Sequence, residues 1–122
     1  MRLGIDLVRL DELDRLLRRA WFVRYVFAAD ELAHAETLGD SRRREYLAGR
    51  FAAKEAVLKV LGTGLFEGVA PRDIALLRDS GGRPTVVLRG SAAHAARSVS
   101  ITHVSVSVTH KRDLVAVVAA GW

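Results

Sequence analysis

The feature that most constrains the fold is one long stretch of helical periodicity, "DSRRREYLAGRFAAKEAVLKVLG", at residues 40–62. On a helical wheel with about 100° per residue, Leu47, Phe51 and Leu58 fall on a single apolar stripe. Gly62 is placed to end the helix, because glycine tolerates the left-handed conformation that stops a helix. The pattern predicts a long central helix that the rest of the chain packs around.

The remaining segments predict a mixture of strands and shorter helices. Residues 2–10 alternate as a strand does, while residues 11–21 and 30–39 have helical spacing. Four further strands are expected at 73–79, 85–90, 103–110 and 114–121, with a turn at 79–84 and a short helix at 90–99. We therefore expect one α+β domain over residues 1–122, with a mostly antiparallel sheet packed against the long helix.

Composition narrows the class of protein. A chain of 122 residues, half of them hydrophobic, suits one domain, and the absence of cysteine excludes disulfides, thiolate metal sites and a cysteine nucleophile. The N-terminus lacks the order of a signal peptide and no stretch is long enough to span a membrane, so a cytoplasmic protein is expected. The net charge of +5 is spread along the chain, without a basic tract for nucleic acid.

Two charges interrupt the long helix. Lys54 falls inside the apolar stripe of the wheel and Glu55 lies on its margin, with Lys59 one turn further on. In a purely structural interpretation, Glu55 and Lys59 form a surface pair worth a few tenths of a kcal/mol, and Lys54 extends its ammonium to solvent. In the functional interpretation, these residues serve chemistry.

Asp6 is the second anomaly, because a carboxylate in "LGIDLV" interrupts an apolar strand where it would be costly to bury unpaired. It can cap the following helix, form a salt bridge, or converge with Glu55. Two carboxylates that approach closely share a proton or a cation, and with only oxygen ligands that cation is Mg²⁺. Spacing alone leaves these alternatives open.

Two weaker signals lie elsewhere. His110 ends a strand beside Lys111 and Arg112, which is typical of a surface histidine and also of a phosphate contact. The glycines of "GTGLFEG" either stop the helix or let a ligand approach the backbone, but they lack the spacing of a P-loop. The other three histidines have no metal-ligand spacing.

Taken in order, "GIDLV", "GRFAAKEAVLKVLGTG", "DIALLRDSGGRPTVVLRG" and "VSVSVTH" resemble the holo-acyl-carrier-protein synthase family of phosphopantetheinyl transferases. The similarity spans nearly the whole chain, and the central segment is its most specific part. It implies transfer of 4′-phosphopantetheine from coenzyme A to a serine of an apo acyl carrier protein, with Mg²⁺, leaving adenosine 3′,5′-bisphosphate.

The resemblance also implies roles for particular residues. Asp6 and Glu55 would be the Mg²⁺ ligands, and Lys59 would face the pyrophosphate and assist proton transfer. With Asp6, Glu55 and Lys59 as the catalytic group, the other implied residues are contacts to coenzyme A. These contacts are Arg50, Lys54, Gly62, Gly64, Arg83, Pro84 and His110, together with Lys59 itself, and the alternative role of Lys54 is to order the site.

The family resemblance further implies a homotrimer with active sites between subunits, and an acidic carrier as partner. The expected docking surface is basic and comprises Arg15, Arg18, Arg19 and Arg24. "SRRRE" at 41–45 is a second basic cluster, for which a solvated helix face is preferred. The chain departs from the family pattern at Asp11, Glu12, Tyr25 and Ala28, which leaves the carrier open between fatty-acid and polyketide synthesis.

Three rival functions remain at this stage. A nucleic-acid-binding domain explains why 16 of the 19 basic residues are arginine but leaves Asp6 and Glu55 unexplained. A Mg²⁺-dependent phosphohydrolase would use the same carboxylates with water as the acceptor. A structural trimer would use the charged residues only as pairs across an interface, and it predicts that Glu55→Gln retains full activity.

Overall fold

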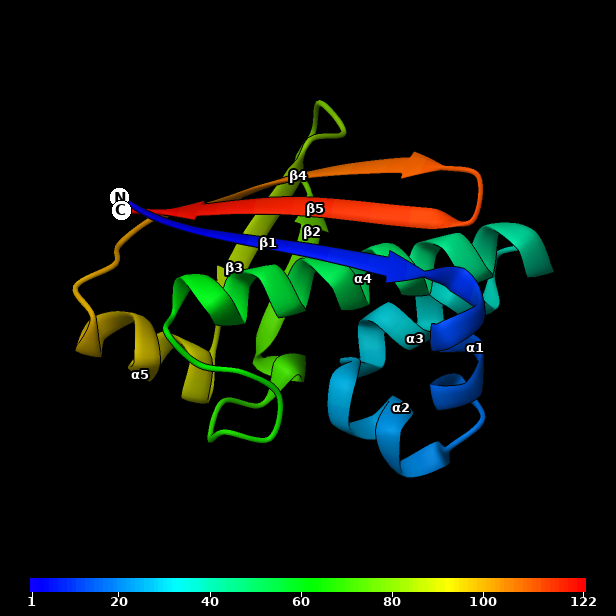
Figure 1. Ribbon diagram of the computed structural model, residues 1–122, viewed down its shortest axis with the longest axis horizontal. Helices are drawn as coiled ribbons and strands as arrows, with labels where there is room; N and C mark the ends of the chain where they lie inside the picture. The colour runs from blue at the N-terminus through cyan, green and yellow to red at the C-terminus, as the bar shows by residue number, and fades with distance from the viewer.

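A computed structural model describes residues 1–122 and places two antiparallel sheets around one long helix (Figure 1). In chain order the elements are β1 Arg2–Arg9, α1 Leu10–Leu17, α2 Ala20–Val26, α3 Ala29–Glu36, α4 Asp40–Val60, a 3₁₀ turn η1 Pro71–Asp73, β2 Ile74–Arg78, β3 Pro84–Leu88, α5 Gly90–Ser98, β4 Val104–Lys111 and β5 Leu114–Gly121. The expected α+β class is confirmed, and every strand pair is antiparallel. None of the helices is both long and apolar enough to cross a lipid bilayer.

The strands form two separate sheets. β5 is the centre of a three-stranded sheet, with β1 on one side and β4 on the other, while β2 and β3 form a hairpin of their own. The three strands lie along one side of α4, α1 to α3 gather at one end of α4, and α5 lies near the other end (Figure 1). This arrangement leaves α4 enclosed along most of its length.

Small residues let β1 cross α4 very closely. Ala52, Ala53 and Ala56 of α4 have no exposed surface. A Cβ added to Gly4 of β1 would lie 2.0 Å from the Ala56 carbonyl oxygen, so only glycine permits this approach. Because alternate residues of a strand share a face, the side chain of Asp6 is turned toward the same helix.

The single helix expected over residues 11–21 is wrong, because the structure interrupts it between α1 and α2. α1 ends at Leu17, Arg19 is extended with φ −95° and ψ 112°, and α2 begins at Ala20. In an unbroken helix Leu13 and Phe22 would point about 180° apart. The break allows both side chains to be buried, at 1% and 2% exposed.

Candidate active site

Asp6 and Lys59 meet where β1 crosses α4. Lys59 Nζ donates a hydrogen bond to the Ile5 carbonyl oxygen at 2.6 Å and lies 3.3 Å from Asp6 Oδ1. The Asp6 side chain is only 15% exposed, and its Oδ2 is buried without a hydrogen-bond partner. A buried carboxylate oxygen without a donor is costly, and a bound ligand can remove that cost.

Glu55 belongs to the same cluster. Burial raises the pKa of Glu55, the negative charge of Asp6 raises it further, and the Lys59 ammonium lowers it. Burial also raises the pKa of Asp6, although Lys59 offsets part of this effect. Because each carboxyl resists ionisation, a cation placed between them would be stabilised by both. The structure thus shows the salt bridge that was one alternative for Asp6, with Lys59 as its partner, and places Glu55 near enough for the charges of both residues to act on it.

The donor set of this cluster fits one kind of cation. Asp6 and Glu55 offer only oxygen ligands, and no group of three or more metal-ligating side chains gathers in residues 1–122. Mg²⁺ commonly takes one or two carboxylates and completes its shell with water and phosphate oxygens. Two carboxylates with one unpartnered oxygen fit that ion and do not fit the closed cage of a structural zinc.

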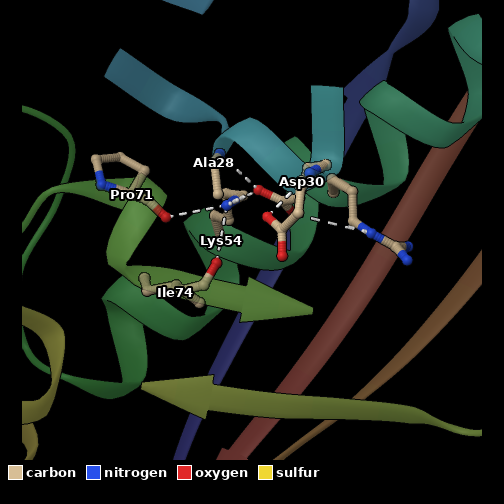
Figure 2. Close-up of polar contacts among 7 residues, drawn as sticks. Ala28, Asp30, Lys54, Pro71 and Ile74 are labelled. Atoms are coloured by element: carbon tan, nitrogen blue, oxygen red, sulfur yellow. Dashed lines mark hydrogen bonds and ion pairs between the residues drawn. The ribbon is translucent and has the colours of Figure 1, made fainter. Parts of the chain in front are cut away.

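Lys54 is not available to a ligand, and its expected contact with coenzyme A is wrong. Its side chain is 1% exposed and its ammonium donates to Glu31 Oε1 at 2.6 Å. It also donates to the carbonyl oxygens of Pro71 at 3.0 Å and Ile74 at 2.8 Å (Figure 2). The three acceptors use all three ammonium protons. Lys54 therefore ties α4 to α3, η1 and β2, and burial lowers its pKa although Glu31 raises it.

A separate groove of about 730 Å³ is lined by residues of α3, α4, β2, β3 and β4. Its lining includes Arg42, Arg50, Arg78 and His110 against one acidic residue, Glu45. Arginine guanidinium groups bind phosphate oxygens through paired hydrogen bonds. The excess of basic groups suits this groove to an anionic ligand such as a phosphate ester.

Three of the expected coenzyme A contacts lie in this groove, namely Arg50, Pro84 and His110. The His110 ring rests against α4 at Gly49, where an added Cβ would lie 3.8 Å from His110 Nε2. This distance is an ordinary van der Waals contact, so the ring packs directly on the helix backbone at Gly49. The structure therefore collects from α4, β3 and β4 residues that are far apart in the sequence.

The groove also contains residues that sequence reasoning missed, among them Tyr46 and Arg78. The Arg50 guanidinium carbon lies 4.4 Å from the centroid of the Tyr46 ring, within the range of a cation–π contact. Arg78 ends β2 opposite Pro84. The hairpin register implied by the turn at 79–84 could have identified Arg78, because it places this arginine beside Pro84.

Three other expected coenzyme A contacts are not in the groove. Gly62 has φ +79° and ends α4, with the Thr63 amide bonded to the Leu58 carbonyl oxygen. This geometry supports the alternative of a helix stop. Gly64 lies beyond it beside Glu67, and Arg83 is exposed on the turn before Pro84.

The expected docking arginines are all at the surface. Arg15, Arg18, Arg19 and Arg24 are exposed along α1, the break and α2. Arg44 of the second basic cluster is instead held by Asp14, with Arg44 Nη2 donating to Asp14 Oδ2 at 2.6 Å.

Tyr25, one of the departures from the family pattern, has a structural partner. Its hydroxyl accepts a hydrogen bond from the Phe66 amide at 3.1 Å, and the two rings stack with centroids 4.9 Å apart. Phe66 has φ +62°, which is uncommon for a residue other than glycine. Tyr25 thus stabilises the loop after α4, next to the exposed Trp21.

The two parts of the candidate site are distinct within one chain. None of the residues that line the groove is Asp6, Glu55 or Lys59. The carboxylates lie at the crossing of β1 and α4, whereas the groove follows the earlier turns of α4 around Gly49. His110 and the carboxylates therefore do not form one pocket in a single chain.

Comparison with known sequences matches most of this chain to one protein family. The profile of the 4′-phosphopantetheinyl transferase superfamily matches residues 2–119. The holo-[acyl-carrier-protein] synthase of Desulfovibrio desulfuricans is 40% identical over 113 residues, covering 91% of this chain and 88% of the relative. That of Moorella thermoacetica is 38% identical over 117 residues, covering 95% of this chain and 89% of the relative.

Solved structures agree over nearly the full length. The holo-[acyl-carrier-protein] synthase of Neisseria meningitidis superposes with a TM-score of 0.87 at 29% identity, covering 99% of this chain and 97% of that one. The Bacillus anthracis enzyme in complex with CoA (3′,5′-ADP) gives a TM-score of 0.80 at 28% identity, covering 98% and 94%. Both matches include β1, α4 and the strands of the groove.

Proposed function

The chain belongs to the 4′-phosphopantetheinyl transferase superfamily, and from this premise we propose that it acts as a holo-[acyl-carrier-protein] synthase. It transfers 4′-phosphopantetheine from coenzyme A to a serine of an apo acyl carrier protein. The serine oxygen forms a bond to the β-phosphorus of coenzyme A, and the bond from that phosphorus to the bridging oxygen breaks. Adenosine 3′,5′-bisphosphate leaves. The observation that carries the proposal is the cluster of Asp6, Glu55 and Lys59, in which one ammonium lies beside two carboxyl groups that could hold a cation.

The chemistry suits these residues, because phosphoryl-type transfer depends on positioning and on neutralising charge. Asp6 and Glu55 would hold Mg²⁺, which when bound supplies neutralisation of the pyrophosphate. The Lys59 side chain is 49% exposed, so its ammonium can leave the Ile5 carbonyl oxygen and reach a phosphate oxygen. The attacking hydroxyl belongs to the carrier, which accounts for a site without a nucleophile of its own.

The basic groove would bind the nucleotide end of coenzyme A. Arg50, Arg78 and His110 are suited to its phosphate groups, and Pro84 gives an apolar surface at the same place. The B. anthracis enzyme, which has the same fold, was solved in complex with CoA (3′,5′-ADP). That complex supports coenzyme A as the substrate here.

We also propose that the working unit is a homotrimer. Leu3, Ile5 and Leu7 of β1 are 64–67% exposed on the outer face of the sheet, with Val118 of β5 opposite Ile5. Large aliphatic side chains grouped on one face are typical of a subunit interface. The groove of a single chain does not contain Asp6, Glu55 or Lys59, which fits an active site completed by a neighbouring subunit.

The partner is an apo acyl carrier protein from fatty-acid or polyketide synthesis, encountered in the cytoplasm. Its acidic surface would dock on the exposed arginines 15, 18, 19 and 24. The exposed aromatic pair of Trp21 and Phe66 lies on the adjoining surface, at 51% and 61% exposed. The proposed docking region therefore combines basic groups with apolar groups.

The test is intact-mass spectrometry of apo carrier proteins incubated with this protein, coenzyme A and Mg²⁺. We expect a gain of one phosphopantetheine that is absent with EDTA and absent with Glu55→Gln. A panel of fatty-acid, polyketide and peptide carriers identifies the partner. No gain on any carrier, or full activity in Glu55→Gln, contradicts the proposal, and breakdown of coenzyme A without a carrier would indicate a phosphohydrolase instead.

A further inference from the structure

The buried ion cluster around Glu31 has a feature that a structural role for Lys54 does not explain. Glu31 lies on α3, is 3% exposed, and has cations on both of its carboxylate oxygens. Lys54 contacts one oxygen and Arg50 faces the other. We propose that Glu31 is a positioning residue that orients Arg50 for the phosphate groups of coenzyme A, an inference that rests on the proposed function.

The first oxygen of Glu31 is held in place by two donors. Oε1 accepts from Lys54 Nζ at 2.6 Å and from the Ala28 backbone amide at 3.0 Å. Ala28 precedes α3 and has no side-chain acceptor, so only the glutamate half of a capping box is present. Figure 2 shows Lys54 between Ala28 and the carbonyl groups of Pro71 and Ile74. These contacts fix the carboxylate relative to α3, α4 and β2.

The second carboxylate oxygen of Glu31, Oε2, faces the Arg50 guanidinium. Glu31 Oε2 is buried without a hydrogen bond, and so is Arg50 Nε. The two atoms lie 3.9 Å apart, and each is the other's ion-pair partner. The Arg50 side chain is 13% exposed and packs over the Tyr46 ring. Glu31 on one side and Tyr46 on the other restrict the guanidinium, which lines the groove.

Lys54 thus acts on the groove only through Glu31. A flexible arginine loses conformational entropy when it binds a ligand, whereas a restricted one loses less. Charge alone predicts the opposite effect, because a carboxylate behind Arg50 lowers the positive potential that attracts phosphate. Removing the charge of Glu31 should therefore weaken binding if Glu31 positions Arg50, and strengthen binding if only charge matters.

The experiment is a double-mutant cycle measured by calorimetric titration of the full chain with coenzyme A and with adenosine 3′,5′-bisphosphate. Glu31→Gln should weaken binding about tenfold in the wild-type background, and less than about twofold when Arg50→Gln is already present. The KM for coenzyme A should rise with kcat unchanged. Tighter binding, or an equal loss in both backgrounds, overturns the proposal.

Glu31→Gln leaves the Lys54 ammonium buried without a counter-ion, and this could weaken binding by unfolding the chain. A second variant separates that effect from the loss of positioning. Glu31→Gln with Lys54→Met removes both charges, and the Ala28 amide keeps the glutamine oxygen on its own side. This variant should still bind about tenfold more weakly, and wild-type affinity in it overturns the proposal. Asp14→Asn removes the distant ion pair with Arg44 and is the control for a general loss of stability.

The outcomes separate the two proposals. Wild-type protein that binds coenzyme A and modifies a carrier, combined with an additive cycle, removes the positioning role and leaves the transferase intact. Wild-type protein that binds neither coenzyme A nor adenosine 3′,5′-bisphosphate overturns both.

Discussion

Lys54 and Lys59 lie five residues apart on α4, and each is paired with a carboxylate from another element, yet their surroundings differ completely. Lys54 is 1% exposed and donates to three acceptors, so its pair with Glu31 is closed to ligands. Lys59 is 49% exposed, and the Oδ2 of its partner Asp6 has no donor. A buried pair whose ammonium has used all its donors joins elements of the fold, whereas a pair with a half-exposed lysine and an unpartnered carboxylate oxygen can bind a ligand.

The largest expected effect breaks the closed pair. Lys54→Met leaves Glu31 buried without its ammonium partner, which should lower the free energy of unfolding by about 3–5 kcal/mol. Urea denaturation followed by circular dichroism measures this loss.

The control for that prediction removes both charges. Glu31→Gln with Lys54→Met should recover part of the lost stability, because no unpaired carboxylate is then buried, although Arg50 loses its counter-ion and the Pro71 and Ile74 carbonyl oxygens lose a donor. A single variant as stable as wild type would mean that the Glu31–Lys54 pair does not hold α3 against α4.

The second prediction concerns the open pair. Lys59→Met should leave the free energy of unfolding within about 1 kcal/mol of wild type, because partly exposed ion pairs contribute little. It should lower kcat for carrier modification about a hundredfold, since it removes a cation at the pyrophosphate. Quench-flow or mass-spectrometric rates on an apo carrier measure the loss, with Arg43→Met as an exposed α4 control of similar size. Wild-type kcat would remove Lys59 from the catalytic group.

The contrast between the two lysines also shows what the sequence could predict. The periodicity of α4 was sufficient to predict the long helix, whereas the position of Asp6 in an apolar strand predicted only that its carboxylate needs a partner and left a cap, a salt bridge and convergence with Glu55 as alternatives. Gly4 makes that convergence possible through its contact with Ala56, a local feature of β1.

The partner of Lys54 was not predictable in the same way. Glu31 is 23 residues away, and in sequence it has the ordinary place of an acidic residue in the first turn of a helix. Only the packing of α3 on α4 makes it a buried counter-ion. The break between α1 and α2 was missed for a similar reason, because it follows from where Leu13 and Phe22 must be buried.

The smallest expected effect is a change of stability with pH in the open cluster, measured without divalent cations. The folded-state pKa of Asp6 is raised above its unfolded value. Protonated Asp6 therefore contributes to the stability of the fold. This contribution is fully present below the ordinary pKa of an aspartic acid, and it is lost as the pH rises through the raised pKa of folded Asp6. Asp6→Asn should accordingly stabilise the protein near neutral pH by about 1 kcal/mol, with the difference vanishing in acid.

A second aspartate-to-asparagine variant should change the stability in the opposite direction. Arg44 lowers the pKa of Asp14, so Asp14→Asn should reduce stability near neutral pH, again with no difference in acid. Thermal unfolding from pH 3 to 8 follows both variants, and added Mg²⁺ should raise the melting temperature of wild type but not of Asp6→Asn. If Asp6→Asn were destabilised at neutral pH, ionised Asp6 would be satisfied in the folded chain, and the reason for expecting a cation there would be lost.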